Sequence, residues 1–278
     1  MTYIKSALLS FFLFIGNAAH AAQPEPWALG FQPSASPIQE QVVEFHNLLL
    51  WIISIIVLLV LALIIYVSLR FNKKTNKKPS TVSHNTLIEV IWTAIPLIIL
   101  VIIIIPSFGL LYKMDRTPDP EMTLKITGYQ WYWGYEYPDY DGISFLSYMK
   151  KDDELLEGEL RLLATDTMVV LPVQTNIQLL VTSADVIHSF AMPAFGVKKD
   201  AVPGRINETW VRINEPGIYY GQCSEICGKD HAYMPIMIKA VTKEEFDAWV
   251  VTAKEEYATY DQPIKNLAIN YTTTDIIQ

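Results

Sequence analysis

Histidine and cysteine are scarce in this chain of 278 residues, which contains five histidines and two cysteines. No histidine occurs within the two long apolar runs, at residues 48–69 and 90–111, and no other part of the sequence supplies a set of haem ligands. The chain also lacks an internal repeat. We therefore do not expect it to bind haem by itself.

Charged residues are absent from both apolar runs. Each run is longer than the about 20 residues that a helix needs to cross the hydrocarbon core of a bilayer. Residues 48–69 and 90–111 are therefore predicted to form a transmembrane hairpin.

Acidic residues are absent from the start of the loop between the runs, which carries only basic charges before Glu89: Arg70, Lys73, Lys74, Lys77 and Lys78. Lysine and arginine are absent from the preceding arm, residues 22–47, which contains Glu25, Glu40 and Glu44. Basic loops stay in the cytoplasm, so both termini are expected outside it.

The first segment, residues 1–21, has the pattern of a signal peptide. Lys5 precedes a short apolar run, and Ala19, His20 and Ala21 resemble a small-residue cleavage site. The alternative, a third membrane helix, is disfavoured because the run is too short. We expect cleavage after Ala21 or Ala22.

Basic residues are outnumbered by acidic ones beyond residue 115, and the whole chain has a formal net charge of −8. This balance excludes nucleic acid as a partner and favours a basic protein. An acidic surface is also ordinary for a soluble domain.

The segment 115–257 is predicted to be an all-β sandwich or barrel, and the order of its candidate ligands resembles that of a cupredoxin-like Greek-key sandwich. Short runs rich in β-branched and aromatic residues recur between turn residues, beginning at Thr123, Thr167, Asn176, Ile206, Gly217 and Pro235. One soluble helix is expected after Thr242, which forms a capping-box pattern with Glu245. Residues 258–278 are treated as a C-terminal tail.

Four soft-ligand residues occur within twelve positions, in CSEICGKDHAYM: Cys223, Cys227, His231 and Met234. In a straight strand the cysteines would be about 13 Å apart, so a shared metal requires a curled loop. That loop would join two strands, with His188 arriving from the end of an earlier one, as in a cupredoxin sandwich. A disulfide and a structural zinc site remain open, but the thioether and the second thiolate favour paired copper ions.

Longer strings carry a family resemblance: GYQWYWGYEY, DVIHSFAMPAFGVKKDAVPGR and YYGQCSEICGKDHAYMPI, after two membrane spans. From about residue 40 to 255 the chain resembles subunit II of haem-copper cytochrome c oxidases, most closely those of alphaproteobacteria. The resemblance implies a dinuclear copper centre, CuA. Cys223 and Cys227 would bridge the ions, with His188, His231, Met234 and the carbonyl of Glu225 as further ligands.

The same resemblance implies roles for residues that composition alone would not single out. The Glu225 side chain would bind magnesium or manganese at the border with subunit I, and Trp131 would receive electrons from cytochrome c. Glu89, in NTLIEVIW, would lie at the mouth of a proton channel of subunit I. Four acids would form the docking surface for cytochrome c: Glu136, Asp139, Asp141 and Asp185. Each of these residues also has a more ordinary interpretation. Glu225 and the four acids would be solvated surface charges, Trp131 would be part of the sandwich core, and Glu89 would anchor its helix at the lipid head groups.

The function implied is that of the electron-entry subunit of a proton-pumping cytochrome c oxidase, with the copper domain in the periplasm of a bacterial inner membrane. A mitochondrial inner membrane is the alternative location. A membrane-anchored copper-delivery protein is the alternative function.

Two other classes of protein are disfavoured. A quinol-oxidase subunit would lack the cysteines and His231. A soluble reductase would need a second catalytic domain, and the two membrane spans leave no length for one.

Overall fold

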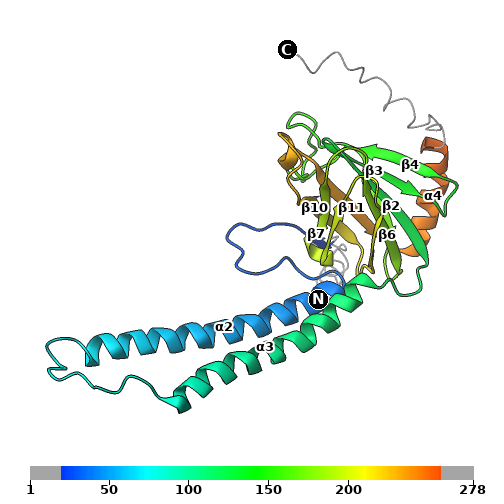
Figure 1. Ribbon diagram of the computed structural model, residues 1–278. Coiled ribbons are helices and arrows are strands. Elements are labelled where there is room, and N and C mark those ends of the chain that lie inside the picture. The colour runs from blue at the N-terminus through cyan, green and yellow to red at the C-terminus, as the bar shows by residue number, and fades with distance from the viewer. Residues whose placement is uncertain (1–19, 258–278) are drawn as a thin grey trace, which may run out of the picture. The chain divides into compact units, whose positions relative to one another are not determined.

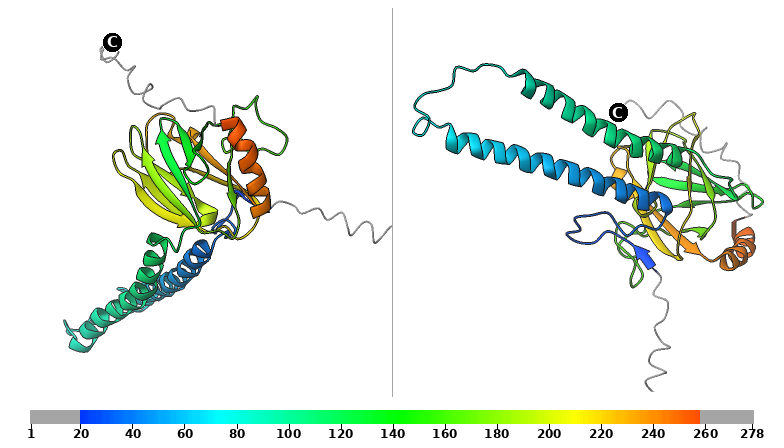
Figure 2. Two further views of the ribbon diagram at one scale, coloured as in Figure 1. Left: turned by 90° about the vertical axis from the view of Figure 1, so that its right-hand side faces the viewer. Right: turned by 90° about the horizontal axis from the view of Figure 1, so that it is seen from below.

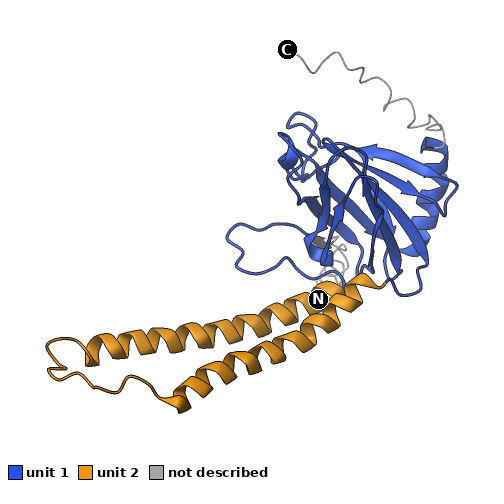
Figure 3. Cartoon of the chain, viewed as in Figure 1, with its two compact units in different colours: residues 1–37, 117–278 blue, residues 38–116 orange. Residues whose placement is uncertain are grey.

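The structure is a computed structural model that describes residues 20–257. Residues 1–19 of the predicted signal peptide and the tail, residues 258–278, lie outside this range. The predicted cleavage position falls within strand β1 (His20–Ala22), and no described contact tests it. The described chain forms two compact units, coloured separately in Figure 3. One is Ile38–Arg116, and the other combines residues 20–37 with residues 117–257.

The helical unit consists of two long helices, α2 (Pro37–Arg70) and α3 (Thr86–Asp115), joined by a loop (Figure 1). Both are long and apolar enough to cross a membrane, and their apolar side chains are largely exposed, which suits contact with lipid. Helix α3 begins at an N-cap, Asn85, whose side chain accepts a hydrogen bond of 3.2 Å from the backbone N–H of Ile88. The predicted transmembrane hairpin is confirmed, and both helices extend beyond the apolar runs.

The other unit is a sandwich of two β-sheets, seen from two further sides in Figure 2. One sheet has the order β5-β11-β10-β7-β8, with β1 pairing with β10, and the other has the order β4-β3-β2-β6-β9. Their strands are β1 (His20–Ala22), β2 (Met122–Tyr129), β3 (Tyr132–Tyr137), β4 (Ile143–Ser147), β5 (Val169–Pro172), β6 (Ile177–Ser183), β7 (His188–Met192), β8 (Val197–Ala201), β9 (Asn207–Val211), β10 (Gly217–Cys223) and β11 (Pro235–Val241). In the parallel pairs β2–β6 and β5–β11, the chain crosses to the other sheet and back between the two paired strands. The two sheets confirm the predicted sandwich.

The core lies between the two sheets. Residues of β2 alternate, with Leu124 and Ile126 buried and Lys125 on the outer face. Trp133 of β3 is fully buried and packs edge-on against Phe190 of β7, in the opposite sheet, with ring centroids 5.4 Å apart. This packing holds β3 and β7 rigidly together directly beside the candidate ligand His188.

Helix α4 (Lys243–Tyr257) follows the last strand and confirms the helix predicted after Thr242. The backbone N–H of Thr242 donates to the carboxylate of Glu245 at 2.9 Å, and the N–H of Glu245 donates to the Thr242 hydroxyl at 3.3 Å. These two bonds form a capping box. Strands β4, β7 and β8 were not anticipated, because they are short and β8, with the sequence VKKDA, has little apolar content.

Candidate metal centre

The candidate ligands gather where strands β7 and β10 meet the loop that leads to β11. His188 is the first residue of β7, and Cys223 is the last residue of β10. These strands pair antiparallel at this point. Cys227, His231 and Met234 all lie in the β10–β11 loop, so this loop is curled as the cysteine spacing predicted.

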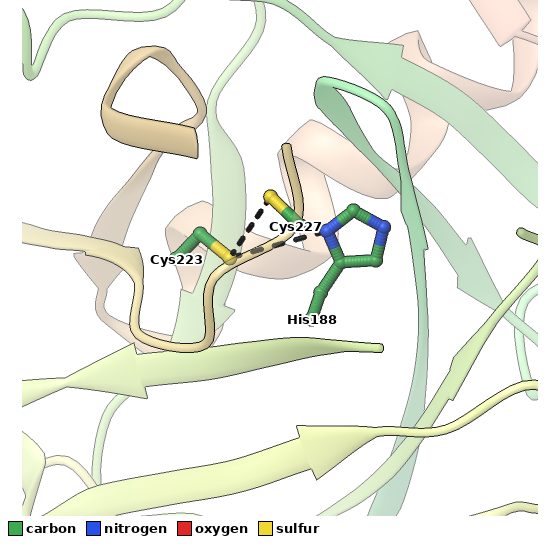
Figure 4. Close-up of side chains that lie close together, drawn as sticks. All are labelled: His188, Cys223 and Cys227. Carbon is green, nitrogen blue, oxygen red and sulfur yellow. Dashed lines mark hydrogen bonds between the residues drawn. The ribbon is translucent and has the colours of Figure 1, made fainter. Parts of the chain in front are cut away.

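Three buried residues form the centre of the cluster: His188, Cys223 and Cys227 (Figure 4). The two Sγ atoms are 3.9 Å apart. Nδ1 of His188 lies 3.9 Å from Sγ of Cys223. All three ligand atoms lie within 4.8 Å of one another, close enough to share metal ions.

Further donor atoms lie on both sides of the thiols. On the side of Cys227, Nδ1 of His231 is 3.5 Å and Sδ of Met234 is 3.6 Å from its Sγ. On the side of Cys223, the backbone carbonyl of Glu225 is 3.3 Å from its Sγ. The structure thus brings together all six ligands that the sequence named.

The electrostatics of the cluster favour ionisation of one thiol. Burial alone would raise the pKa of Cys223, but hydrogen bonds with His188 and with the backbone of Glu225 and Ser189 lower that pKa to about 7. Burial and the neighbouring charge of Cys223 raise the pKa of Cys227. A thiolate is the form that binds a metal, so Cys223 is ready to bind near neutral pH.

Two side chains from the β2–β3 turn contact the metal-binding loop. The side-chain amide of Gln130 donates a bond of 2.8 Å, and the indole N–H of Trp131 donates one of 3.2 Å, to the carbonyl of Cys227. Gly228 makes this approach feasible, because its φ of +127° favours glycine and a Cβ there would lie 2.8 Å from the Trp131 ring. Trp131 is half-buried rather than fully exposed.

The four predicted docking acids come from three parts of the sandwich: strand β3, the β3–β4 turn and the β6–β7 loop. Asp185 is beside the centre, where its carboxylate lies 2.9 Å from Nε2 of His188. Glu136 is on the outer face of β3 and forms an ion pair of 2.7 Å with Lys125.

Asp139 and Asp141 lie in the β3–β4 turn, where Asp141 pairs with Lys254 of α4 at 2.5 Å. Six extended steps from Trp131 to the end of β3 span about 20 Å, so Asp139 and Asp141 lie farther along the hairpin than Glu136. Their part in docking stays a prediction.

Two further predicted roles concern side chains with no described contact to the thiols. The Glu225 side chain is half-buried in the β10–β11 loop, and Glu89 lies in the first turn of α3, in the helical unit. The described contacts test neither the magnesium nor the proton-channel role.

Sequence reasoning missed three residues that shape the centre. Gln130 bonds to Cys227, and Trp133 donates its indole N–H to the carbonyl of Met234 at 3.3 Å. Gly128 leaves room for the His188 ring, since a Cβ there would lie 2.8 Å from it. These residues were visible in the sequence, but the contacts of Gln130 and Trp133 cross 97 and 101 residues and that of Gly128 reaches His188 on another strand.

The donor set fits copper. The two described cysteines are free, and their sulfurs are far beyond the about 2.05 Å of a disulfide bond. Two thiolates, two imidazoles and a thioether are soft donors, and the thioether favours copper over zinc. Fold and site together define a membrane-anchored protein whose β-sandwich carries a candidate copper centre.

Comparison with known proteins gives the family. Residues 24–110 match "Cytochrome C oxidase subunit II, transmembrane domain", and residues 122–241 match "Cytochrome C oxidase subunit II, periplasmic domain". The chain therefore belongs to the cytochrome c oxidase subunit II family, which confirms the resemblance seen in the sequence.

Two relatives, matched by sequence, agree with this assignment. The chain is 50% identical to a probable cytochrome c oxidase subunit 2 of Rickettsia bellii over 252 residues, which is 91% of each protein. It is 49% identical to cytochrome c oxidase subunit 2 of Oenothera berteroana over 232 residues, covering 81% of this chain and 90% of that one. The crystal structure of the periplasmic domain of subunit II of the Bradyrhizobium japonicum cytochrome oxidase is 52% identical, with a TM-score of 0.48, and covers 51% of this chain and 99% of that one.

Proposed function

We propose that this chain is the electron-entry subunit of a proton-pumping cytochrome c oxidase. It accepts electrons from cytochrome c and passes them to haem in subunit I, where dioxygen is reduced to water. The observation that carries the proposal is the pair of free thiols, 3.9 Å apart and flanked by His188, His231 and Met234. This is a ligand set for two ions rather than one.

The residues that would hold two copper ions are Cys223, Cys227, His188, His231 and Met234, together with the backbone carbonyl of Glu225. Such a pair supplies one-electron chemistry with little rearrangement, because the charge is shared between two softly ligated ions. The protein holds the ligands in place before metal arrives: Trp133 fixes the carbonyl of Met234, and Gln130 fixes that of Cys227.

Electrons would enter at Trp131, whose indole contacts the backbone of a copper ligand. The acidic side chains of Glu136 and Asp185 lie on this part of the domain and would attract a basic cytochrome c, with Asp139 and Asp141 contributing to the field from farther away. The Glu225 side chain, a hard oxygen donor, would bind magnesium or manganese at the border with subunit I.

The membrane topology supports a bacterial inner-membrane location. The loop after Arg70 is basic and would face the cytoplasm, which places the β-sandwich in the periplasm. In a mitochondrion the same orientation would place the sandwich in the intermembrane space.

The test is metal analysis and electron paramagnetic resonance of the full chain, purified in detergent and loaded with copper. We expect two coppers per chain and a hyperfine pattern from one electron shared equally by two copper nuclei. The variant Cys227→Ser should lose this sharing, while Ser224→Ala, which changes an adjacent residue that is not a ligand, should keep it. Bound zinc, a Cys223–Cys227 disulfide, or ready release of copper to an apo-acceptor would reject the proposal, the last in favour of copper delivery.

A further inference from the structure

Asp185 has more contacts with the metal centre than a docking charge requires. One carboxylate oxygen, Oδ1, accepts from the backbone N–H of Val186 at 2.6 Å and lies 2.9 Å from Nε2 of His188. The Ser183 hydroxyl is 3.3 Å from the same oxygen. The other oxygen, Oδ2, accepts from the backbone N–H of Gln130 at 2.7 Å.

These contacts fix the proton on the His188 ring. A carboxylate only accepts hydrogen bonds, so Nε2 must carry the hydrogen. It is then Nδ1 that lies toward Sγ of Cys223, and once it gives up any proton shared with that sulfur its lone pair faces the metal site. His188 is therefore held in the tautomer that can bind a metal.

The ring is also held sterically. Its side chain is fully buried. Gly128 lies against one part of the ring, where even a Cβ would come within 2.8 Å, and Trp133 packs edge-on with ring centroids 5.9 Å apart. With Asp185 bound to Nε2, the imidazole has no freedom to turn Nδ1 away from the thiols.

Asp185 also connects the two sides of the ligand cluster. It binds the backbone of Gln130, and the Gln130 side chain in turn binds the carbonyl of Cys227 at 2.8 Å. A continuous chain of hydrogen bonds thus runs from His188 of β7 through Asp185 and Gln130 to Cys227 in the β10–β11 loop.

We propose that Asp185 is a positioning residue of the metal centre, which fixes the tautomer and orientation of His188 and links that ligand through Gln130 to the loop of Cys227. This inference rests on the proposed copper function. It assigns Asp185 a role that is separate from docking, because only 32% of its side chain is exposed and both of its oxygens are engaged.

The role has measurable consequences. A carboxylate bound to the far nitrogen of a histidine makes the ring a stronger donor, which stabilises the more highly charged, oxidised state of a bound metal. Removing the carboxylate should therefore raise the reduction potential. It should also weaken copper binding by roughly 10- to 100-fold, the range for loss of such partners.

The experiment compares Asp185→Asn with the control Asp166→Asn in the full chain, purified in detergent and loaded with copper. Asp166 makes a matched control because its carboxylate also accepts two backbone hydrogen bonds, from Tyr148 and Thr167, and the substitution removes the same charge. Copper affinity, reduction potential and the resonance spectrum are measured for both. We expect the affinity loss and the higher potential only in Asp185→Asn.

The outcomes separate this inference from the proposed function. If the unmodified chain fails to bind paired copper, the proposed function is rejected. If it does bind paired copper but Asp185→Asn and Asp166→Asn behave alike, the positioning role of Asp185 is rejected. Should Asp185→Asn not fold, two other variants test the inference. Gln130→Ala removes only the link to Cys227, and unchanged copper affinity there would overturn the linking role. Asp185→Glu keeps the charge but displaces the carboxylate, and unchanged copper affinity and potential there would overturn the positioning of His188.

Discussion

The indole N–H of Trp131 donates a hydrogen bond of 3.2 Å to the backbone carbonyl of Cys227. This contact joins a half-buried aromatic ring directly to the backbone of a candidate copper ligand. We expect Trp131→Phe to slow electron transfer from cytochrome c by roughly tenfold or more, equivalent to about 1.4 kcal/mol in the barrier. Copper content should not change.

Stopped-flow reduction of the assembled oxidase by cytochrome c measures this rate. Trp210→Phe, on strand β9, is the control for the loss of an indole and should reduce normally. Equal rates in Trp131→Phe and the unmodified oxidase would exclude Trp131 as the entry point.

Gly128 permits the His188 ring to sit beside strand β2, since a Cβ at this position would lie 2.8 Å from the ring. We expect Gly128→Ala to displace the ring and to destabilise the domain by about 1–3 kcal/mol, the usual cost of overpacking. Copper affinity should fall as well. Urea unfolding and copper titration measure both effects, and Gly30→Ala, where a Cβ meets nothing within 4 Å, should show neither.

The local part of the copper site could be predicted from sequence, whereas its supports could not. Cys223, Cys227 and Met234 lie within twelve residues of sequence, so their types and spacing favoured a copper site, and the family resemblance completed the ligand set. Gln130 lies 97 residues from Cys227, and only the pairing of strands brings them together.

The position of Asp139 depends on the fold in the same way. It is close to Trp131 in sequence, but the extended strand β3 runs between them. The sandwich itself was predictable because alternating burial, as in β2, follows from the period of a strand.

Glu136 and Asp141 lie at different distances from Trp131 along the β3–β4 hairpin and allow the docking surface to be mapped. Steering by the whole field of a protein changes association rates by roughly 10- to 1000-fold, and single charges contribute a part of this. We expect Glu136→Gln to lower the association rate with cytochrome c and the salt dependence of that rate, and Asp141→Asn to have a smaller effect. Rates measured over a range of ionic strength test this, and equal slopes for the two variants would place the partner elsewhere.

Glu159 organises the segment 150–163 by accepting hydrogen bonds from the backbone N–H of Leu156 and from Lys150 at 2.7 Å. These bonds, the backbone bond first, lower the pKa of Glu159. A lowered pKa means that the stabilisation is complete above about pH 4.3, the pKa of an unfolded glutamate, and is lost as the pH falls through the lower folded value.

Glu159→Gln should therefore reduce stability at pH 7 by about 1 kcal/mol or less and should lose less stability than the unmodified chain on acidification. Urea midpoints at pH 7 and pH 4 measure the difference. Glu157→Gln, an exposed acid of the same segment, is the control and should keep the original pH dependence.

Glu89 occupies the first turn of α3, where a carboxylate is stabilised by the free N–H groups of the helix start. If this acid serves the mouth of a proton channel in subunit I, Glu89→Gln removes the proton-binding group while it leaves the copper ligands untouched, since they lie in the other compact unit. We expect proton uptake and turnover of the assembled oxidase to fall by roughly tenfold, or about 1.4 kcal/mol in the barrier, with an unchanged copper spectrum.

The control is Glu40→Gln, which alters the matching first-turn acid of α2. The positive-inside rule places this acid on the opposite side of the membrane, so the variant should turn over normally. Normal proton uptake in Glu89→Gln would show that this carboxylate only anchors the helix end, because an anchoring acid can be replaced by its amide without loss of proton transfer.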